Sequence, residues 1–584
     1  MKGLFFMTML ACCSAAGKAQ TPATVYPLGS YDEPQLDEAY NAEPWTQLDD
    51  PARLRFAWTS KDVHHPKREV PATCHGDTAR VKAWRGERVG LEAVVFSGAP
   101  VDKQLRLAMS PWRNAANGAE VADASNGQGR FMRYVITDDF RSCGTHDFSL
   151  PPRLVADVID ADSIDGHEAR TTRPVWCTLE VPRNLAAGTY ATTMTLLADG
   201  LPVDSLTVSI DVADRTLPEP SRQHFHLDLW QQPYAIARYH GVAPWSPEHF
   251  EAMRPYMESL ARAGQKVVSA ILFYEPWGDQ SHDKFEPMIQ TVKGADGRWR
   301  YDYTVFDRYV EMMEQCGIGE QINCFSMIPW DMSFRYFDEK SGQYEYLTTQ
   351  TSTDEYRELW TAFLTSFADH LRATGRFEKT CIAMDERGLP AMLDAYNLLT
   401  ETVPDMKMAL AGNYHTELAD KLYDYCVTKN PKFTAEELAD RKAKGYKTTF
   451  YTCCADPMPN IFSNSDPADA VYLPLHAAAN DLDGYLHWSW VNWDEHPLTD
   501  TRFRLFGSGD TYLFYPGNRS SLRFERLIEG IQQYEKVRIL RGENPSDPTL
   551  EAALAKFRNT ADLTPENSTA KLVNELKDVV GNIE

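Results

Sequence analysis

The stretch TDEYRELWTAFLTSFADHLRATGRFEKTCIAMDE, residues 353–386, carries the strongest indication of the fold. Its first half places apolar side chains three and four positions apart, which aligns them on one face of a helix. Ser352 and Glu355 have the spacing of a capping box, which predicts where this helix begins. Segment 379–385 is short and apolar, as buried strands are, and ends at two adjacent carboxylates. The stretch therefore predicts a helix that leads into a buried strand.

The same alternation of strand and helix continues on both sides of this stretch. The segments with the composition of buried strands are 224–230, 266–274, 320–328, 379–385, 406–410, 422–427, 446–452 and 482–490. Amphipathic segments separate them. Eight strands with intervening helices are the set that closes a (β/α)8 barrel. We therefore predict a TIM-like barrel over residues 223–517.

The residues before the barrel follow a different pattern, with short strand-like segments between turn residues and no long amphipathic helix. Segments 190–197 and 203–212 flank Asp199-Gly200, and an Asp-Gly pair between two strands is a strong hairpin signal. Recurrent short strands of this kind are typical of a β-sandwich. We predict an N-terminal β-sandwich at 24–213.

The chain is expected to be a multidomain protein that combines an all-β domain with an α/β barrel. Its 584 residues and 66.2 kDa are too much for one compact domain. Two prolines mark a linker at 214–222 between the sandwich and the barrel. Residues 518–584 are predicted to form a C-terminal helical segment.

Composition and charge exclude several classes of function. Hydrophobic residues make up 43% and aromatic residues 11% of the chain, enough to build a large core and to exclude general disorder. The 59 basic and 83 acidic residues give a formal net charge of −24. Such a charge repels phosphate backbones, so we expect no nucleic-acid partner. A neutral ligand such as a sugar is compatible with it.

The first residues, MKGLFFMTMLACCSAAGKAQ, have the features of a secretory signal peptide. Lys2 precedes an apolar run that is too short to span a bilayer, and small residues follow. We predict a signal peptide at 1–19 and an exported protein, periplasmic, extracellular or on the cell surface. A lipid anchor at Cys12 is the less favoured alternative, because the residues before it make a poor lipobox. Since no later segment has transmembrane length, no integral membrane segment is expected.

The cysteines do not form a recognisable metal site or disulfide scaffold. Nine remain after the signal peptide, spread over the chain without a CxxC pair, and there is no HExxH motif. We therefore expect neither a metal nor an organic cofactor. The adjacent Cys453 and Cys454 are compatible with a bridge between neighbours, but two core thiols are the favoured interpretation.

Candidate binding residues follow from the predicted strand ends, because barrels of this kind carry their active sites at the carboxyl ends of the strands. The aromatic, amide and acidic residues at these ends are Trp230, Tyr274, Trp330, Asp385, Glu386, Asn413, Tyr414, Tyr451, Trp488 and Trp490. A single tryptophan at a strand end more often packs in the core than binds a ligand. Several that converge on one rim favour a pocket for a sugar, which has apolar CH faces and a rim of hydroxyls.

The adjacent carboxylates Asp385 and Glu386 are the strongest local indication of chemistry. Consecutive residues on a strand point to opposite faces, so both enter one site only where the strand ends, as Gly388 and Pro390 indicate. Two close carboxylates do not ionise easily together, and one of them can then serve as an acid. The alternative is a surface Asp-Glu pair, which is common in proteins.

The seventh predicted strand argues against an ordinary double displacement. Glycosidases of that type take their two carboxylates from different strands. Here Tyr451 ends the strand, and the next carboxylate, Asp456, is followed by a proline. This arrangement favours a reaction in which the substrate supplies the nucleophile, while one carboxylate orients it and the other transfers protons.

These motifs together resemble glycoside hydrolase family 123. The resemblance rests on Met-Asp385-Glu386-Arg, on GYLHWSW at 484–490 with Asn492-Trp493, on GDTYLFYPG at 509–517, and on the charged helix at 523–535. It covers most of the chain after the signal peptide. The Asp-Glu pair alone is a weak motif, but its combination with the tryptophan-rich segment and the Gly-Asp block is specific.

The resemblance implies an exo-acting, retaining β-N-acetylgalactosaminidase that acts on glycosphingolipids or related glycans with a terminal amino sugar. Its catalysis would be substrate-assisted: the oxygen of the 2-acetamido group attacks the anomeric carbon. Asp385 would hold the acetamido N–H and stabilise the oxazolinium-like intermediate, and Glu386 would be the general acid and base. No cofactor is implied.

Further roles implied by the resemblance concern the sugar itself. Tyr414 and Tyr451 are the candidates for a hydrogen bond to the acetamido carbonyl. Trp488 or Trp490 would enclose the acetamido methyl, and Asp510 would bind sugar hydroxyls, although an Asp in Gly-Asp-Thr is also able to cap a turn. Two other functions stay open: a secreted glycosidase of this architecture that acts on another sugar, and a non-catalytic carbohydrate-binding protein. The sequence indicates no particular oligomeric state.

Overall fold

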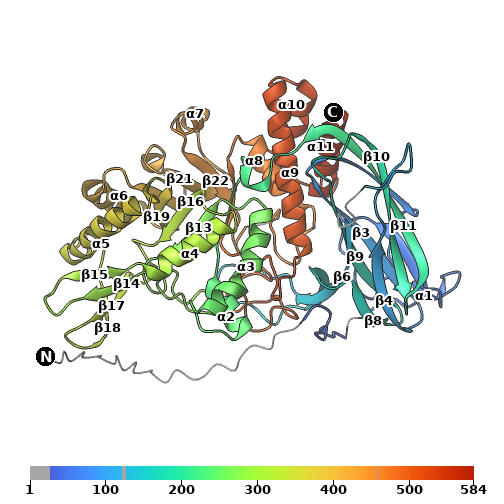
Figure 1. The fold of residues 1–584 in the computed structure, drawn as a ribbon, viewed down its shortest axis with the longest axis horizontal. Helices are drawn as coiled ribbons and strands as arrows, with labels where there is room; N and C mark the ends of the chain where they lie inside the picture. The colour runs from blue at the N-terminus through green and yellow to red at the C-terminus, as the bar shows by residue number, and fades with distance from the viewer. Residues whose placement is uncertain (1–26, 38, 122–126, 457, 584) are drawn as a thin grey trace, which may run out of the picture.

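The structure is a computed structural model that describes residues 27–37, 39–121, 127–456 and 458–583. It consists of an N-terminal β domain, a barrel and a group of C-terminal helices (Figure 1). The predicted signal peptide and Cys12 lie outside the described residues. Within the described ranges, no helix is both long enough and apolar enough to cross a membrane.

The N-terminal domain is the predicted β-sandwich. Its sheets have the strand orders β1-β3-β9-β6-β7 and β2-β11-β10-β4-β8, with β5 paired to β10. The strands are β1 (Arg55–Thr59), β2 (Thr78–Arg85), β3 (Arg88–Ser97), β4 (Val101–Met109), β5 (Arg113–Asn114), β6 (Gly127–Thr137), β7 (Arg153–Ile159), β8 (Ser163–His167), β9 (Thr171–Glu180), β10 (Gly188–Ala198) and β11 (Leu201–Thr216). Apolar side chains from both sheets form one core. Asp199 and Gly200 have φ angles of 47° and 77° and make the predicted tight turn between β10 and β11.

The segment between the domains is partly regular. β11 continues to Thr216, and Pro220–Arg222 form a 3₁₀ turn before the first barrel strand. The linker expected at 214–222 therefore begins within a strand.

The barrel has the eight parallel strands that the sequence predicts, in the order β12-β23-β22-β21-β20-β19-β16-β13. They are β12 (His226–Leu229), β13 (Val267–Ile271), β16 (Gln321–Phe325), β19 (Thr380–Asp385), β20 (Lys407–Gly412), β21 (Asp424–Thr428), β22 (Lys447–Tyr451) and β23 (Gly484–His487). A bridge between Leu227 and Gln265 joins the two ends of this order and nearly closes the barrel. Because consecutive strands run in the same direction, the carboxyl ends of all eight lie on one face.

Helices cover the outside of the barrel. They are α2 (Pro233–His240), α3 (Pro247–Arg262), α4 (Thr304–Gln315), α5 (Asp354–Ala373), α6 (Leu389–Thr402), α7 (Ala435–Ala443), α8 (Asp469–Ala479) and α9 (Leu522–Glu543). β20 is followed by a 3₁₀ turn, Thr416–Leu418, instead of a helix.

The helix and strand of residues 353–386 form as predicted, with a shift of one residue at the cap. α5 buries the apolar stripe seen in the sequence, and β19 is buried until its last residue. Thr353, not Ser352, caps α5: its hydroxyl accepts the Tyr356 N–H at 3.2 Å. The capping box expected from Ser352 is therefore wrong, because the helix begins one position later.

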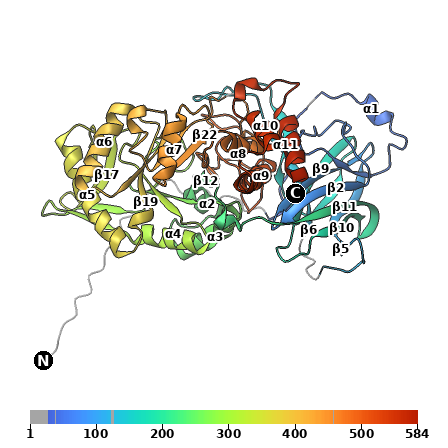
Figure 2. The ribbon, with the colours of Figure 1, turned by 90° about the horizontal axis from the view of Figure 1, so that it is seen from above.

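A four-stranded sheet not foreseen from the sequence is inserted after β13 and β16. Its order is β15-β14-β17-β18, with β14 (Gln290–Lys293), β15 (Trp299–Asp302), β17 (Ser333–Asp338) and β18 (Gln343–Thr348). It lies at the end of the molecule away from the N-terminal domain (Figures 1 and 2).

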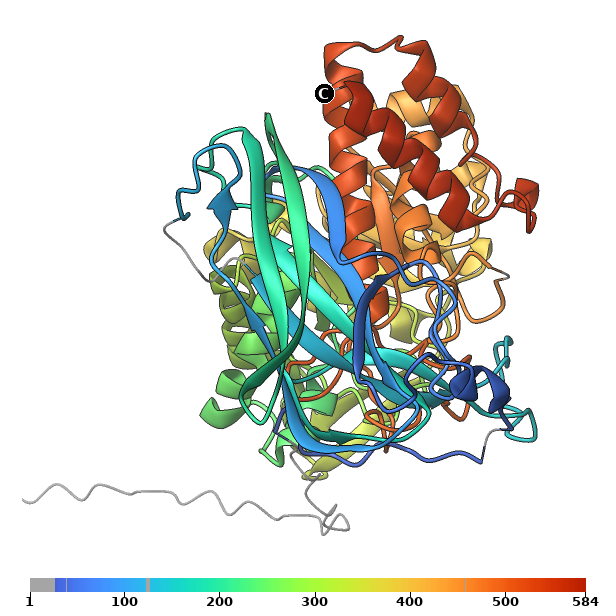
Figure 3. The same ribbon diagram turned by 90° about the vertical axis from the view of Figure 1, so that its right-hand side faces the viewer.

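The C-terminal helices tie the barrel to the sandwich. α9 lies between the two (Figure 1) and is buried over most of its length. α10 (Pro548–Ala555) and α11 (Thr569–Ile583) pack with α8 and α9 (Figure 3). Charged side chains of α9 meet partners in the sandwich: Glu525 accepts from Arg88 at 2.8 Å, and Glu529 accepts from Lys61 at 2.7 Å. The helix was expected, but its position between the domains was not.

Candidate active site

A cavity of about 540 Å³ opens at the carboxyl ends of the barrel strands. It contains most of the side chains that the sequence nominated. Those that line it are Trp230, Trp330, Asp385, Glu386, Asn413, Tyr451, Trp488 and Asp510. Asp385 and Tyr451 end their strands, whereas Asp510 lies in a loop after β23. The lining combines tryptophans and other apolar side chains with carboxylates, an amide and a phenol.

Three nominated residues do not line this cavity. Trp490 is fully buried and packs against Phe514, with ring centroids 5.1 Å apart. The Tyr414 hydroxyl donates to Glu437 at 2.6 Å and lies outside the cavity lining. Tyr274 lies beneath Arg335, whose guanidinium carbon is 3.9 Å from the centre of its ring. The expectation that these three residues contact a sugar in the cavity is therefore not supported, because none of their side chains lines it.

Asp385 and Glu386 enter the cavity together because β19 ends between them. The Glu386 N–H donates to Asp385 Oδ1 at 2.8 Å, which turns the backbone at the last residue of the strand. Gly388 then caps α6, with Pro390 in the first turn of the helix. The end of the strand thus removes the alternation that would otherwise place the two carboxylates on opposite faces.

Asp385 is the more buried carboxyl of the pair. Its Oδ2 accepts the indole N–H of Trp330 at 3.0 Å. Burial, and then the charge of Glu386, raise the pKa of Asp385 to about 6, against the lowering effect of the Trp330 hydrogen bond. Asp385 is therefore ionised at neutral pH, but only by a small margin.

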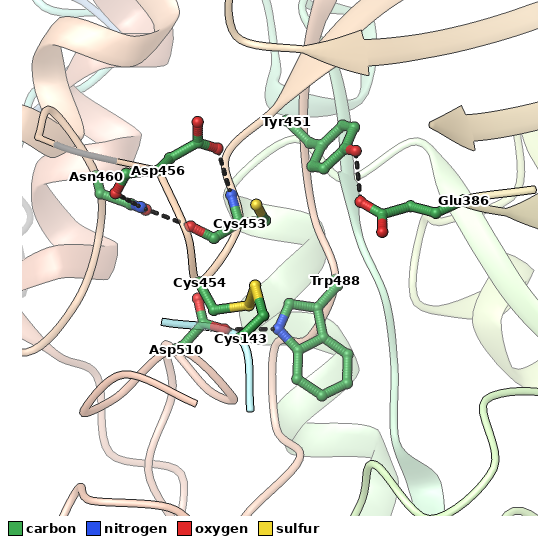
Figure 4. Close-up of a disulfide and its surroundings, with 9 residues drawn as sticks. All are labelled: Cys143, Glu386, Tyr451, Cys453, Cys454, Asp456, Asn460, Trp488 and Asp510. Atoms are coloured by element: carbon green, nitrogen blue, oxygen red, sulfur yellow. Dashed lines mark hydrogen bonds between the residues drawn. A yellow bond between two sulfur atoms is a disulfide. The ribbon is translucent and has the colours of Figure 1, made fainter. Parts of the chain in front are cut away.

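Glu386 is exposed to the cavity and meets a tyrosine from the far strand β22. The Tyr451 hydroxyl donates to Glu386 Oε1 at 2.6 Å (Figure 4). Burial, followed by the charge of Glu386, raises the pKa of Tyr451 well above its usual value. The phenol therefore stays protonated and remains a hydrogen-bond donor.

The cavity holds a third carboxyl, Asp510. Its Oδ2 accepts the indole N–H of Trp488 at 3.0 Å (Figure 4), and its Oδ1 has no hydrogen-bond partner among the described residues. Burial raises the pKa of Asp510 to about 7. A buried oxygen without a partner in the lining of a cavity is suited to accept a hydrogen bond from a ligand hydroxyl.

The N-terminal domain contributes part of the wall, which the sequence did not indicate. Cys143 and Gly144, on the connection between β6 and β7, line the cavity. Cys143 forms a disulfide with Cys454 of the barrel, 311 positions away (Figure 4). The Gly144 N–H donates to the Leu505 carbonyl at 2.9 Å and so joins the domains at the same place.

The interpretation of Cys454 as a core thiol is therefore wrong, while Cys453 keeps its thiol. The odd number of cysteines was compatible with one bridge but did not identify the pair. Within the described ranges, Cys143, Cys453 and Cys454 have the only ligand atoms found close enough together for a metal. Two of these sulfurs are joined to each other, and burial raises the pKa of Cys453 to about 12, so the group does not offer three thiolates.

Removing the disulfide is expected to loosen this wall. The double replacement Cys143→Ser and Cys454→Ser should lower the free energy of unfolding by about 2–4 kcal/mol, because it releases a long closed loop in the unfolded chain. It should also raise KM, since the loop that carries Gly144 loses its covalent anchor. Denaturant unfolding and steady-state kinetics measure both effects. Cys74→Ser, at an exposed thiol, is the control, and equal stability of all three proteins would contradict the expectation.

Two family descriptions match the chain. "Glycoside hydrolase 123, catalytic domain" matches residues 230–540, and "Glycoside hydrolase 123 N-terminal domain" matches residues 58–198. The first match extends into α9, which lies beyond the strands of the barrel.

Solved structures give a similar result. The chain is similar to a family 123 glycoside hydrolase from Clostridium perfringens whose structural analysis addressed glycolipid glycan hydrolysis, with 25% identity and a TM-score of 0.82. That alignment covers 91% of this chain and 98% of the other.

A protein of Bacteroides vulgatus ATCC 8482 provisionally described as a glycoside hydrolase aligns over 80% of this chain and 79% of its own, at 11% identity and a TM-score of 0.30. A Bacteroides ovatus GH5 xyloglucanase aligns over 82% of this chain and all of its own, at 9% identity and a TM-score of 0.29. Scores as low as these last two carry no weight. No curated protein matches the chain.

Proposed function

The chain belongs to glycoside hydrolase family 123, and on that premise we propose that it releases terminal β-linked N-acetylgalactosamine from glycans with retention of configuration. The observation that carries the proposal is the Asp385–Glu386 pair at the end of β19, inside a cavity with aromatic walls. Glycans of glycosphingolipids are the proposed substrates, supported by the subject of the work on the Clostridium perfringens relative.

In the proposed reaction the substrate supplies the nucleophile. The acetamido oxygen attacks the anomeric carbon while Glu386, the more exposed carboxyl, protonates the leaving oxygen. Asp385 accepts the acetamido N–H and stabilises the positive charge of the oxazolinium-like intermediate. Glu386 then deprotonates the water that opens this intermediate.

The other carboxyl of the cavity is a poor candidate for a protein nucleophile. Trp488 holds one oxygen of Asp510, and burial raises the pKa of Asp510 to about 7, so it is often protonated at neutral pH. A protonated carboxyl attacks poorly. We assign Asp510 to a sugar hydroxyl instead, through its oxygen that has no partner among the described residues.

Tyr451 is the proposed donor to the acetamido carbonyl. Its hydroxyl donates to Glu386 Oε1, so it would turn from that carboxylate to the carbonyl when the sugar binds, and its raised pKa keeps the proton on the phenol. Tyr414, the other candidate from the sequence, is engaged with Glu437 outside the cavity lining. Trp488 is proposed to enclose the acetamido methyl, since Trp490 is buried in the core.

Hydrolysis of three aryl glycosides tests the proposal: β-N-acetylgalactosaminide, β-N-acetylglucosaminide and plain β-galactoside. Release from the first alone is the expected result. Turnover of the plain galactoside would mean that the protein supplies the nucleophile. An inverted product, detected by NMR, would rule out substrate assistance. Absence of hydrolysis of all three would leave two interpretations, a non-catalytic carbohydrate-binding protein and an enzyme that requires a larger glycan.

The pH profile is expected to report the ionisation of Asp385. Because the carboxylate form is needed and its pKa is about 6, kcat/KM should fall as the pH drops through 6. Trp330→Phe removes an N–H that stabilises the charged form, so the pKa should rise and the acid limb should move up by about one pH unit. Trp299→Phe, outside the cavity lining, is the control. An unmoved limb in Trp330→Phe would contradict the assignment.

We also propose that the protein is exported to an oxidising compartment. A disulfide between two domains supports this, because such bonds persist outside the reducing cytosol. The N-terminal sequence of the mature protein, recovered from fractionated cells, tests it. Cleavage after residue 19 agrees with the signal peptide, a lipid on Cys12 agrees with the anchor, and an intact N-terminus in the cytosol contradicts both.

A further inference from the structure

One face of the inserted sheet is covered only in part by the described residues: Tyr274 and Glu286 contact Arg335 on it, while the tyrosines of β18 stay exposed. In β17 and β18, Arg335 pairs with Tyr346 and Phe337 pairs with Tyr344, so these four side chains lie on the same face. The opposite face packs on α5, where the ring of Phe334 lies 5.7 Å from that of Trp360. Because that face is turned to α5, the face that carries Tyr344 and Tyr346 is turned outward, away from the helix.

This outward face carries large exposed aromatic side chains. Tyr344 is 53% exposed and Tyr346 is 55% exposed, and Trp330, three positions before β17, is 42% exposed. An exposed ring leaves apolar surface in water, so two on the sheet and a third on the chain leading into it mark an interaction surface more often than a scattered set does.

Arg335 fixes the rings of this face in position. Its guanidinium carbon lies 3.9 Å from the ring centre of Tyr274 and 4.8 Å from that of Tyr344. Glu286 pairs with the same guanidinium and holds it there. We call Trp330, Tyr274, Arg335, Tyr344 and Tyr346 the aromatic platform.

The platform is continuous with the cavity. Trp330 lines the cavity and bonds Asp385 with its indole N–H, while its backbone N–H donates to the Pro276 carbonyl at 2.9 Å, two residues from Tyr274. The segment of β17 from Ser333 to Phe337 is about 13 Å long, because a strand rises about 3.3 Å per residue, and it runs away from Trp330. The platform thus extends the site outward by more than the length of one sugar.

The chemistry of the platform fits sugars. Ring faces stack on the CH faces of a pyranose, and the phenols and the guanidinium bond its hydroxyls. A protein with a net charge of −24 is not attracted to an anionic lipid surface, which makes a membrane the weaker occupant. Glu386, the proposed acid, is the exposed member of the catalytic pair, so the leaving group lies on the solvent side of the site, where the Trp330 side chain is also exposed.

We propose that the aromatic platform binds the sugars on the leaving-group side of the glycan, so that the enzyme prefers oligosaccharides to single-sugar glycosides. This rests on the proposed function, because it assumes that the terminal sugar occupies the cavity. Tyr274 does not line the cavity, but as part of the platform it would contact the sugars on the leaving-group side.

The double replacement Tyr344→Ala and Tyr346→Ala tests the proposal. It leaves every residue of the cavity in place. Its kinetics are compared on an aryl β-N-acetylgalactosaminide, which is too short to reach β18, and on a free tetrasaccharide with terminal β-linked N-acetylgalactosamine. We expect kcat/KM to be unchanged within about 2-fold on the aryl glycoside and to fall by about 10-fold on the tetrasaccharide, through KM. Tyr40→Ala is the matched control, because Tyr40 is an exposed tyrosine under an arginine in the N-terminal domain.

Each other result overturns the platform. If variant and wild type had equal kinetics on both substrates, the platform would not bind the glycan, while the proposed function would still stand. An equal fall on both substrates would mean that the tyrosines act through the fold or the cavity. A fall only on the intact glycolipid in mixed micelles, and not on the free tetrasaccharide, would make lipid the occupant. If the wild type cleaves neither the aryl glycoside nor the tetrasaccharide, the proposed function fails first, and binding of the tetrasaccharide by calorimetry, with and without the two tyrosines, still decides on the platform.

Discussion

Glu386→Gln is expected to lower kcat by about 10²–10⁴-fold on a substrate with a poor leaving group, the usual contribution of a general acid and base. The replacement keeps the shape of the side chain and its bond to Tyr451 but removes the proton that the leaving oxygen needs. The loss should shrink on a dinitrophenyl glycoside, whose leaving group departs without a proton. Steady-state kinetics on a phenyl and a dinitrophenyl β-N-acetylgalactosaminide give the comparison.

The control for this variant is Asp331→Asn. Asp331 follows Trp330 in the sequence and carries the same charge near the cavity, but it does not line it. Its removal should leave kcat within about 2-fold of the wild type. If Glu386→Gln retained full activity on both glycosides, the acid would have to be another residue, and Asp510 would be the first to examine.

Asp385→Asn is expected to reduce kcat by about 10²–10³-fold on both leaving groups, the range for losing one group that stabilises transition-state charge. The amide still fills the site but no longer balances the positive charge of the oxazolinium-like intermediate. Because that charge develops whatever the leaving group is, the loss should not shrink on the dinitrophenyl glycoside.

The contrast between the two variants is the informative measurement. A loss in Asp385→Asn that shrinks with an activated leaving group, as in Glu386→Gln, would exchange the roles of the two carboxyls. Normal activity in Asp385→Asn would point to a different polarising group. The pKa of about 6 for Asp385 adds a check, since the asparagine variant should lose the acid limb of the pH profile.

The barrel was predictable because its strands are short apolar runs between amphipathic helices. Burial on both faces requires that composition, so all eight strands could be located. The inserted sheet was not predictable in this way. β17 and β18 mix exposed tyrosines with charged residues and carry no continuous apolar run, so their pattern did not identify them as strands.

The residues of the candidate site were predicted correctly wherever the end of the strand that carries them was predicted correctly. Asp385 and Tyr451 are the last residues of β19 and β22, and both line the cavity. β23 ends at His487, three residues before the predicted end, and the chain then leaves the barrel wall. Trp490 consequently enters the core, whereas Trp488 remains in the cavity. The partner of Cys454 was beyond prediction, since its place in a loop of another domain depends on the complete fold.

The contacts between the sandwich and the barrel determine what can be separated by protein engineering. Asp157 of β7 accepts from Arg523 of α9 at 2.9 Å, and Asp160 accepts from Arg519 at 2.7 Å, both in buried surroundings. Cutting the chain after β11 would take both carboxylates away from their arginines, and losing one partner of a buried pair costs about 3–5 kcal/mol. It would also take Cys143 and Gly144 from the cavity. The barrel therefore cannot be separated from the sandwich, and a truncated version of the protein has to keep both domains. A fusion partner inserted at the boundary between the domains would disturb these contacts.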